Sequence, residues 1–531
     1  MNPSESDQKP VVIIGAGPAG LTAAYELSKA EVRSVVLEKD RVVGGISRTV
    51  SHNGYCFDIG GHRFFTKIKP VEEMWHEVLA DDFLLRKRMS RIYYAKKFFH
   101  YPLRPFDALR KLGPFKALWI LLSFIRAQVR PIKPERNFEE WVVNRFGRHL
   151  YKIFFKTYTE KVWGMPCTEI SAEWPAQRIK GLSLLSALRE ALIKKTNSAD
   201  VIKTLIDKFH YPKKGPGMMW ERVAEIVSAR GSQVLLNTKT LNILWSDAVT
   251  GLRVQSGSTV DVIEGRHFIS SMPIRELIEC FDPPAPAEVR AAASRLKYRD
   301  FLTVALVLDR DAFPDNWIYI HDSSVKLGRI QNFKNWSPDM VPDPTKTCLG
   351  LEYFCFEGDG LWTMSDKDLI DLGKRELEML GLARAADVLD GAVVRMPKAY
   401  PVYDETYKEA VNVVRAFVEG LGNLQMVGRN GMHKYNNQDH SMVTAMLAAR
   451  NILGGRFDLW AVNVEEGYHE ELDGAPRELG DRDLLVAPDV EDLPRRSFAV
   501  GQEQRPAHHV AYRRETARLL PVPVDQDRLA S

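Results

Sequence analysis

The chain has 531 residues, of which 45% are hydrophobic and 27% charged, and these proportions are typical of a folded globular protein. Its formal net charge of +4 is nearly balanced over this length, so the overall charge gives no reason to expect nucleic acid as a partner. Five scattered cysteines without C-x-x-C spacing argue against a disulfide framework and a zinc ribbon, and we expect no metal site. The polar N-terminus has no signal-peptide pattern, and we expect a cytoplasmic protein.

The first 40 residues predict a compact strand–turn–helix–strand unit. A β-branched run at 11–14 predicts a buried parallel strand, 21–29 a helix and 34–37 a second strand. The turn between the first strand and the helix reads Gly15-Ala16-Gly17-Pro18-Ala19-Gly20, which is a G-x-G-x-x-G motif. Its glycines allow a tight turn, close approach of a pyrophosphate and tight helix packing. Glu38 ends the second strand, where it can reach a ribose hydroxyl, so the unit predicts a dinucleotide site.

A second glycine motif identifies the dinucleotide. The stretch 41–49 (RVVGGISRT) resembles the second motif of the FAD family that includes amine oxidases, protoporphyrinogen oxidases and UDP-galactopyranose mutases. The resemblance implies FAD as the cofactor. The residues expected to contact it are Gly15, Gly17, Ala19, Gly20, Glu38, Gly45, Ser47, Gly61, His62, Thr240, Arg429, Asn437, Gln438 and Ser441.

The remaining pattern predicts an α/β fold in which a Rossmann-type FAD-binding domain is assembled from separated segments. Residues 70–230 are largely helical in pattern, short strands recur over 233–272, 301–308 and 347–356, and helices are expected at 365–379 and 441–453. We therefore expect an FAD-binding domain at 9–69, 208–290 and 420–455. A helical substrate-covering insertion is expected at 70–207, a mixed α+β substrate domain at 291–419, and a C-terminal extension or tail at 456–531.

Several separate segments resemble the UDP-galactopyranose mutases in particular. They are 54–62 (GYCFDIGGH), 154–166 (FFKTYTEKVWGMP), 328–338 (GRIQNFKNWSP), 398–403 (KAYPVY) and 427–441 (VGRNGMHKYNNQDHS). The resemblance implies catalytic roles for His62, Arg178 and Arg329. It implies substrate binding by Tyr158, Trp163, Trp336, Tyr400 and Tyr435. Two positions depart from the mutase pattern: Thr159 replaces an asparagine and Trp336 a tyrosine, so the resemblance leaves the sugar and the nucleotide open.

The resemblance also implies a reaction. In the mutases, N5 of reduced FAD attacks the anomeric carbon of a nucleoside-diphosphate sugar, and ring opening and reclosure interconvert its pyranose and furanose forms. Such an enzyme needs arginines and tyrosines for the diphosphate more than general acids or bases. We therefore expect a nucleoside-diphosphate sugar as substrate, a reductant such as NAD(P)H or a reductase, and a role in cell-surface glycan biosynthesis.

Two other functions are compatible with the same motifs. One is an FAD-dependent oxidase or desaturase of an amine or lipid-like substrate, and the other is a flavoprotein that binds a nucleotide sugar without catalysis. Residues 115–125 (FKALWILLSFI) bear on the first alternative, because an apolar stretch with basic flanks can make peripheral contact with a membrane surface. Its length equally suits a helix buried within the insertion.

Overall fold

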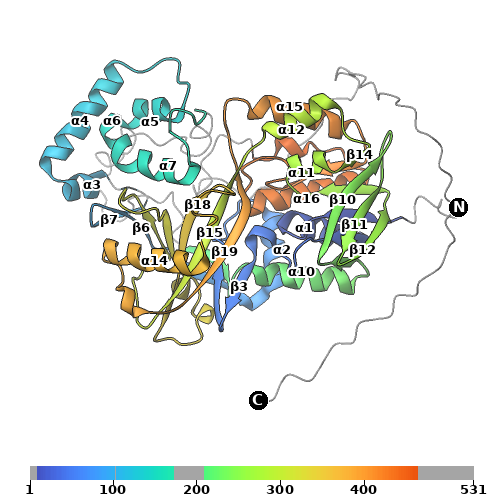
Figure 1. The fold of residues 1–531 in the computed structure, drawn as a ribbon, viewed down its shortest axis with the longest axis horizontal. Coiled ribbons are helices and arrows are strands. Elements are labelled where there is room, and N and C mark those ends of the chain that lie inside the picture. Colours follow the sequence, from blue (N-terminus) through green and yellow to red (C-terminus); the bar gives the residue numbers. More distant parts are fainter. Residues whose placement is uncertain (1–8, 102, 104, 173–207, 464–531) are drawn as a thin grey trace. The chain divides into compact units, whose positions relative to one another are not determined.

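The computed structural model describes residues 9–101, 103, 105–172 and 208–463, all of which belong to one compact unit. Three larger sheets, two two-stranded sheets and the helices packed on them make up this part of the chain (Figure 1). Residues 173–207 of the predicted insertion and residues 464–531 of the predicted C-terminal extension lie outside the described residues.

A five-stranded parallel sheet forms the centre of the N-terminal motif region. Its order is β20-β13-β1-β2-β9. The strands are β1 (Val11–Ile14), β2 (Ser34–Leu37), β9 (Gln233–Leu235), β13 (His267–Ser270) and β20 (Leu424–Met426). These strands come from segments that are far apart in the chain. The structure therefore confirms the predicted α/β class and the assembly of the nucleotide-binding sheet from separated segments.

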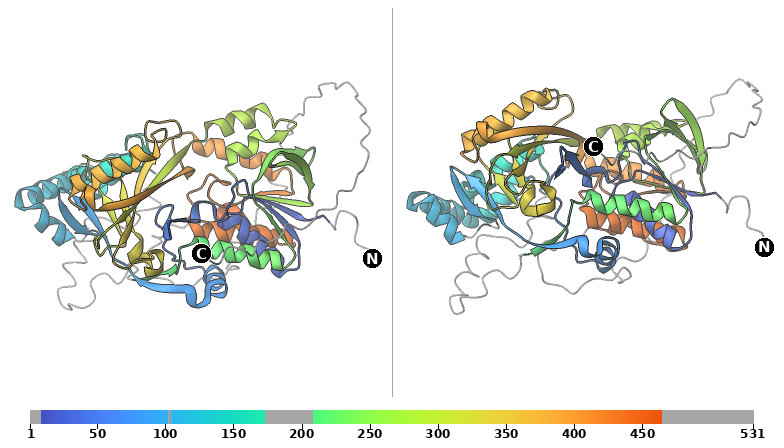
Figure 2. Two further views of the ribbon diagram at one scale, coloured as in Figure 1. Left: turned by 60° about the horizontal axis from the view of Figure 1, so that its bottom comes forward. Right: turned by 90° about the horizontal axis from the view of Figure 1, so that it is seen from below.

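The helix α1 (Pro18–Lys29) packs against both α10 (Gly217–Ala229) and α16 (Gln438–Ile452) (Figure 2). Small residues on α1, including Gly20 and Ala23, are buried, which lets it approach the sheet and its neighbours closely. An added Cβ on Gly20 would lie only 1.8 Å from the carbonyl oxygen of Gly15. The third glycine of the motif is thus required for contact between helix and strand, as predicted.

The strand order places a crevice at the carboxyl ends of the sheet. β1 pairs in parallel with β2 on one side and with β13 on the other, so the loops that follow β1, β2 and β13 diverge to opposite sides of β1. Open parallel sheets bind ligands at such a switch point, beyond the carboxyl ends of the strands. Gly15, Glu38 and Ser271 directly follow β1, β2 and β13, and they therefore meet at this edge.

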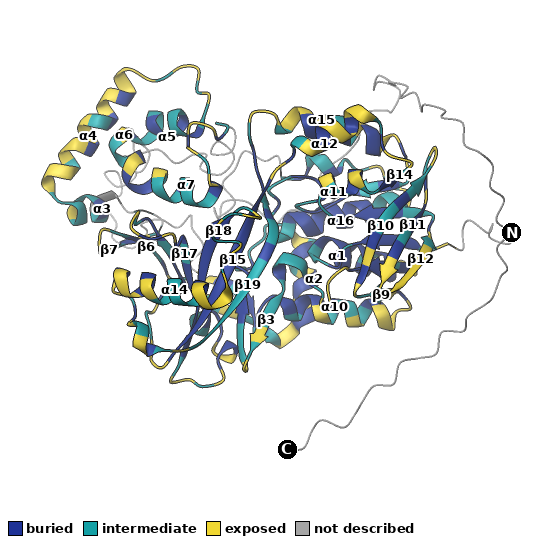
Figure 3. Ribbon diagram, in the orientation of Figure 1, coloured by how far each residue is buried: buried dark blue, intermediate teal, exposed yellow. Residues whose placement is uncertain are grey.

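A seven-stranded sheet in the order β19-β15-β18-β17-β16-β6-β7 forms the second main layer. Its strands are β6 (Ser90–Tyr94), β7 (Lys97–His100), β15 (Tyr298–Leu308), β16 (Trp317–Ile320), β17 (Arg329–Asn332), β18 (Thr347–Cys355) and β19 (Val388–Pro401). β15 and β18 are buried along their whole length, and α14 (Asp366–Leu380) packs its apolar side on the sheet (Figure 3). The strands β6 and β7 come from the region predicted to be largely helical; β6 joins the sheet by pairing in parallel with β16.

Smaller elements complete the described part of the chain. A four-stranded sheet contains β10 (Thr238–Trp245), β11 (Val249–Ser256), β12 (Thr259–Glu264) and β14 (Phe281–Asp282). Two-stranded pairs join β3 (Thr49–His52) to β4 (Tyr55–Asp58) and β5 (Phe83–Lys87) to β8 (Lys208–Pro212). Further helices are α2 (Lys69–Leu79), α11 (Ile274–Glu279), α12 (Ala287–Arg295), α13 (Phe333–Trp336) and α15 (Tyr407–Glu419).

The insertion between β7 and β8 contributes a group of helices. They are α3 (Pro105–Leu112), α4 (Pro114–Val129), α5 (Phe138–Phe146), α6 (Arg148–Tyr151) and α7 (Thr157–Trp163), with one π-helical turn at Lys152–Lys156. The side chain of Asn137 accepts a hydrogen bond from the Glu140 N–H at 3.0 Å and so caps the N-terminus of α5. None of the described helices combines the length and the apolar character that crossing a bilayer requires.

Candidate functional site

The two glycine motifs lie against each other at the end of β1. The Gly44 N–H donates to the carbonyl oxygen of Ala16 at 2.8 Å, and a Cβ on Gly45 would lie 3.4 Å from the Cα of Gly17. Gly15 has a φ of +100°, which only glycine adopts readily. α1 begins directly after Gly17 with no side-chain cap, so the unpaired N–H groups of its first turn are available to an anion.

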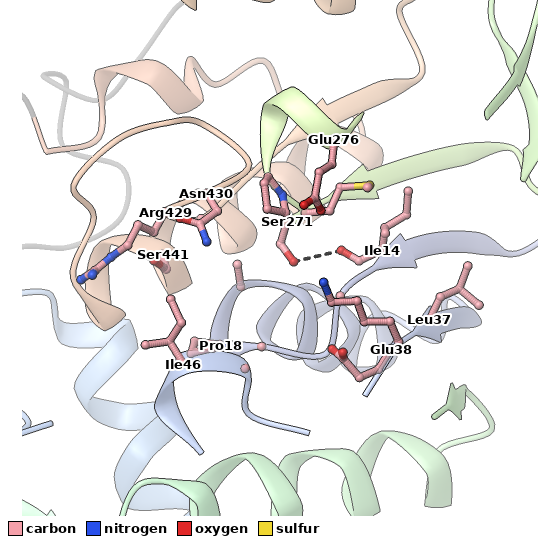
Figure 4. A pocket seen from close by; sticks show the side chains of 18 of the residues that line it. Ile14, Pro18, Leu37, Glu38, Ile46, Ser271, Glu276, Arg429, Asn430 and Ser441 are labelled. Atoms are coloured by element: carbon pink, nitrogen blue, oxygen red, sulfur yellow. Dashed lines mark hydrogen bonds between the residues drawn. The ribbon is translucent and has the colours of Figure 1, made fainter. Parts of the chain in front are cut away.

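A cavity of about 550 Å³ lies at this point, at the carboxyl edge of the parallel sheet. Most predicted cofactor residues line it: Gly15, Gly17, Ala19, Glu38, Gly45, Ser47, His62, Thr240, Arg429, Gln438 and Ser441. Figure 4 shows Glu38 at one end and Arg429 at the other, with the hydrogen bond from the Ser271 hydroxyl to the Ile14 carbonyl, 2.9 Å long, between them. The cavity thus connects the glycine motifs near the N-terminus to the motif at 427–441.

The end of the cavity formed by β2 is suited to a ribose. The Glu38 carboxylate is held in place by the N–H groups of Ala16 at 2.8 Å and Asp40 at 2.9 Å. Each carboxylate oxygen has a further acceptor position beyond these contacts. A carboxylate fixed at the end of the second strand is the arrangement that accepts hydrogen bonds from ribose hydroxyls.

Polar atoms in the cavity wall fit an organic dinucleotide. The Thr240 hydroxyl, the Gln438 amide nitrogen and the Asn430 amide oxygen are buried and have no hydrogen-bond partner within the described part of the chain. All three residues line the cavity. Because leaving a buried polar atom unpaired costs about 1–3 kcal/mol, these groups are suited to a ligand that pairs with them.

His62 lies where the cavity approaches the seven-stranded sheet. Its Nε2 lies 2.9 Å from the carbonyl oxygen of Ile59, which fixes the ring. Burial, with smaller contributions from Arg429 and Arg329, lowers the pKa of His62 to about 4, so the ring is neutral at neutral pH. A neutral imidazole can contact a flat cofactor without adding charge there.

The loop before His62 leads directly to a buried ion pair. A Cβ on Gly61 would lie 2.8 Å from the amide nitrogen of Gln331, so the loop backbone rests on that side chain. Gln331 donates to Glu352 at 2.6 Å, and the Nε of Arg329 donates to the same carboxylate at 2.5 Å. Arg329 and Glu352 are direct cross-strand neighbours on β17 and β18, and the Glu352 side chain is fully buried. Although burial opposes its charge, Glu352 and nearby tyrosines raise the pKa of Arg329.

Arg429 brings two predicted substrate tyrosines together. Its guanidinium lies 5.4 Å from the ring centroid of Tyr400 and 4.8 Å from that of Tyr435, and the two rings stack at 5.6 Å. Its Nε and Nη1 donate to the carbonyl oxygens of Asn436 and Ala399. The charges of Arg329 and Arg429 both act on Tyr400, although burial and Tyr435 keep the pKa of Tyr400 above its ordinary value.

Tyr158 completes the group from α7. Its ring stacks on His321 with centroids 4.8 Å apart and packs edge-on against Tyr319 at 5.5 Å. Burial raises the pKa of Tyr158 well above its ordinary value, with Arg329 acting in the opposite direction. Tyr158, Tyr400, Arg329 and Arg429, predicted from four distant segments, therefore gather beside His62.

Other predicted residues lie elsewhere. Trp336 is 1% exposed, stacks on Trp317 and donates its indole N–H to the carbonyl oxygen of Asn316, so it is part of the core and does not reach the cavity. Its bulk is accommodated there by packing against Phe209 at 5.2 Å. Trp163 is also buried, in a cluster of the helical insertion that reaches Tyr435.

Three further predicted residues do not line the cavity. Gly20 and Gly61 act through close backbone packing, and Asn437 caps α16, where its N–H donates to the His440 ring at 3.2 Å. Arg178 lies outside the described residues. The site also includes groups that the sequence analysis missed: Glu352, Gln331, Tyr319 and His321. The alternation in β17, which places Arg329 and Gln331 on one face, was the signal available for Gln331.

Comparison with known proteins agrees with this geometry. The chain is 25% identical over 296 residues to a 15-cis-phytoene desaturase of Synechococcus elongatus, covering 50% of this chain and 58% of the relative. It is 24% identical over 364 residues to an L-amino-acid oxidase of Crotalus adamanteus, covering 61% and 62%. It thus spans about 60% of the length of these curated relatives.

A solved structure of reduced UDP-galactopyranose mutase shares the fold. The TM-score is 0.73 at 22% identity, with 84% of this chain and 96% of the mutase chain covered. A sequence profile of the family described as flavin containing amine oxidoreductase matches residues 18–453. With the two joined glycine motifs and the cavity between Glu38 and Arg429, this match shows that the chain is an FAD-dependent member of the flavin containing amine oxidoreductase family.

Proposed function

We propose that the protein interconverts the pyranose and furanose forms of a nucleoside-diphosphate sugar. The observation that carries the proposal is the group formed by Arg329, Arg429, Tyr158, Tyr400 and Tyr435 around the His62 end of the FAD cavity. An amine or a polyene has no use for two guanidinium groups, whereas a diphosphate is bound well by them.

The two arginines have donors to offer a diphosphate. Within the described residues, Arg329 forms a hydrogen bond only through its Nε, to Glu352, and Arg429 only through its Nε and Nη1, to backbone carbonyls. Both Nη groups of Arg329 and the Nη2 of Arg429 therefore remain for a ligand. Together with Glu352, the two arginines carry a net charge of +1, which attracts a diphosphate without leaving Glu352 unpaired.

The tyrosines suit the same ligand. Burial raises the pKa values of Tyr158 and Tyr400, so their hydroxyl groups stay protonated and can donate to phosphate oxygens. The Tyr158 ring packs against Tyr319 and the Tyr400 ring stacks on Tyr435, so apolar ring faces surround the positions that a ligand would take. Exclusion of water strengthens the arginine contacts and protects a reactive sugar from hydrolysis.

The reduced flavin, when bound, supplies the nucleophile for the anomeric carbon in this class of reaction. The chain's own residues would hold the departing diphosphate, orient the sugar and keep His62 neutral beside the cofactor. No strong general base is required from the protein for this reaction. The reason is that the diphosphate leaves the anomeric carbon as a stable anion, so its departure needs no proton from a side chain.

A second candidate is oxidation or desaturation of an amine or a lipid-like molecule. It is supported by the sequence similarity to the phytoene desaturase and the L-amino-acid oxidase, and by the exposed apolar face of α4 described below. Both candidates use the same cofactor and the same cavity, so they differ in the ligand that the arginine–tyrosine group accepts.

One experiment separates the candidates. The FAD-loaded protein, reduced with dithionite, is incubated with a panel of nucleoside-diphosphate pyranoses, and furanose formation is followed by NMR; UDP is tested in parallel for protection against thermal unfolding. Oxygen consumption with amines and polyenes, in place of sugar conversion, would support the second candidate and reject the mutase. Stoichiometric nucleotide-sugar binding without conversion or oxygen uptake would indicate a binding protein.

A further inference from the structure

Helix α4 has two apolar faces, of which only one is used inside the fold. Ile120, Phe124 and Ala127 are buried and pack toward α5 and α6. Ile120 and Phe124 belong to a core cluster that also contains Phe154, next to the helix that carries Tyr158. This inward face accounts for the folding of α4 as part of the insertion.

The opposite face is exposed. Phe115 is 82% exposed, Trp119 61% and Val129 72%. The other members of this outward face are Leu118, Leu121, Leu122 and Ile125, each between 46% and 54% exposed. Seven of the fifteen large apolar side chains that are exposed in the described part of the chain thus lie on this one helix (Figure 3). Single exposed apolar residues are ordinary, but a concentration of this kind marks an interaction surface.

The surroundings of the outward face are positively charged. From Ala108 to Pro134 the sequence has no acidic residue and six basic ones: Arg110, Lys111, Lys116, Arg126, Arg130 and Lys133. Lys116, Arg126 and Arg130 are exposed and form no ion pair with an acidic group in the described residues. A helix with Trp, Phe and Leu on one face and Lys and Arg at its border is the arrangement that binds anionic lipid surfaces.

A second copy of the chain is a poorer occupant. A two-fold contact through α4 would bring Lys116 and Arg126 of one copy close to the same cations of the other, without acidic residues to compensate. The helix has 16 residues, so it is about 24 Å long, shorter than the roughly 30 Å of a bilayer core. It therefore suits a position in the plane of the lipid headgroups and not across the membrane.

We propose that α4 binds the protein to a membrane surface that contains anionic phospholipid. Phe115, Trp119 and Leu122 enter the boundary between headgroups and acyl chains, while Lys116 and Arg126 contact lipid phosphates. Membrane attachment through α4 is compatible with either reaction considered above, because α4 lies outside the residues that line the FAD cavity.

Vesicle co-sedimentation of the full-length, FAD-loaded protein tests the proposal. The probes are phosphatidylcholine vesicles with and without phosphatidylglycerol, at low and high salt. We expect binding only to vesicles that contain phosphatidylglycerol, with weakening at high salt. Lys116→Glu combined with Arg126→Glu should reduce the partition coefficient about thirtyfold or more, since the two basic groups contribute about 1 kcal/mol each. Leu118→Ser combined with Leu122→Ser should reduce it to a similar degree.

A matched control removes two half-exposed apolar side chains elsewhere. Val260 and Val262 on β12 are each 52% exposed, and changing both to Ser should leave vesicle binding unchanged. Retained flavin absorbance and circular dichroism establish that each variant is folded. The proposal is overturned if the wild type stays in solution with both vesicle types, or if the control falls as far as the α4 variants. It is equally overturned if light scattering shows a dimer that Leu118→Ser with Leu122→Ser dissociates.

Discussion

The ion pair between Arg329 and Glu352 can be tested by a double-mutant cycle. Glu352 is fully buried, and the side chain of Arg329 is 18% exposed. Changing Glu352 to Gln leaves a guanidinium without its counter-charge, and changing Arg329 to Gln leaves a buried carboxylate without its partner. Removing one partner of a buried pair costs about 3–5 kcal/mol, whereas the Gln–Gln double variant removes both charges together. We therefore expect the double variant to lose much less stability than the sum of the single variants.

Equilibrium urea unfolding followed by tryptophan fluorescence measures the cycle, and UDP titration measures the consequence for the ligand. Glu352→Gln should tighten UDP binding because it removes a negative charge beside the diphosphate, and Arg329→Gln should weaken it by about 2 kcal/mol or more. The pair of Arg91 and Asp315, whose carboxylate is also fully buried, is the control. Asp315→Asn should destabilise the fold without changing UDP affinity. Additive stability losses, or weaker UDP binding in Glu352→Gln, would refute the reasoning.

Three further predictions concern turnover, pH and packing. Arg329→Ala should abolish pyranose–furanose exchange while the purified protein stays yellow, because Arg329 does not line the FAD cavity; flavin loss would contradict its assigned role. Burial lowers the pKa of His62 to about 4 and that of His321 to about 3, below their ordinary value of 6.5. The folded state therefore resists protonation, and the free energy of unfolding should fall as the pH drops from about 6.5 toward 4; His321→Gln should flatten this dependence, by up to about 1.4 kcal/mol per pH unit. Gly20→Ala should lower the thermal midpoint and flavin content, since its Cβ would lie 1.8 Å from a carbonyl oxygen, whereas Gly360→Ala, which meets nothing within 4 Å, should change neither.

The FAD site was predictable because most of its information is local. The unit consists of a strand, a glycine turn, a helix, and a second strand with an acidic residue at its end. These parts are consecutive in the chain, so one short stretch of sequence predicts the whole unit. Gly15, Gly17, Glu38 and Gly45 accordingly lie at the cavity. The sheet around this unit was also predictable in outline, because short β-branched strands recur along the sequence, and β1, β2 and β13 lie where they were expected.

The substrate region was less predictable because its contacts cross the chain. Glu352 is an acidic residue within an otherwise apolar strand, and only the register of β17 against β18 shows that it faces Arg329. Trp336 illustrates the converse: it lies in a segment that resembles a binding loop, yet its ring packs between Trp317 and Phe209. Aromatic residues suit a core as well as a pocket, so position in a motif does not decide between them.

The charge of the site gives the strongest physical reason to prefer a phosphate-bearing substrate. The charges of two guanidinium groups near a cofactor must be compensated when the substrate is absent. Among the described residues, the Glu352 carboxylate compensates Arg329. Arg429 is instead stabilised by carbonyl oxygens and by the ring faces of Tyr400 and Tyr435. An apolar substrate would remove water from Arg429 without replacing those interactions, which is costly for a charged group. A diphosphate would replace them with charge-assisted hydrogen bonds. If a neutral lipid or an amine proved to be the substrate, Arg429 would have to be a structural residue, and Arg429→Leu would then leave substrate affinity unchanged in a protein that still binds FAD.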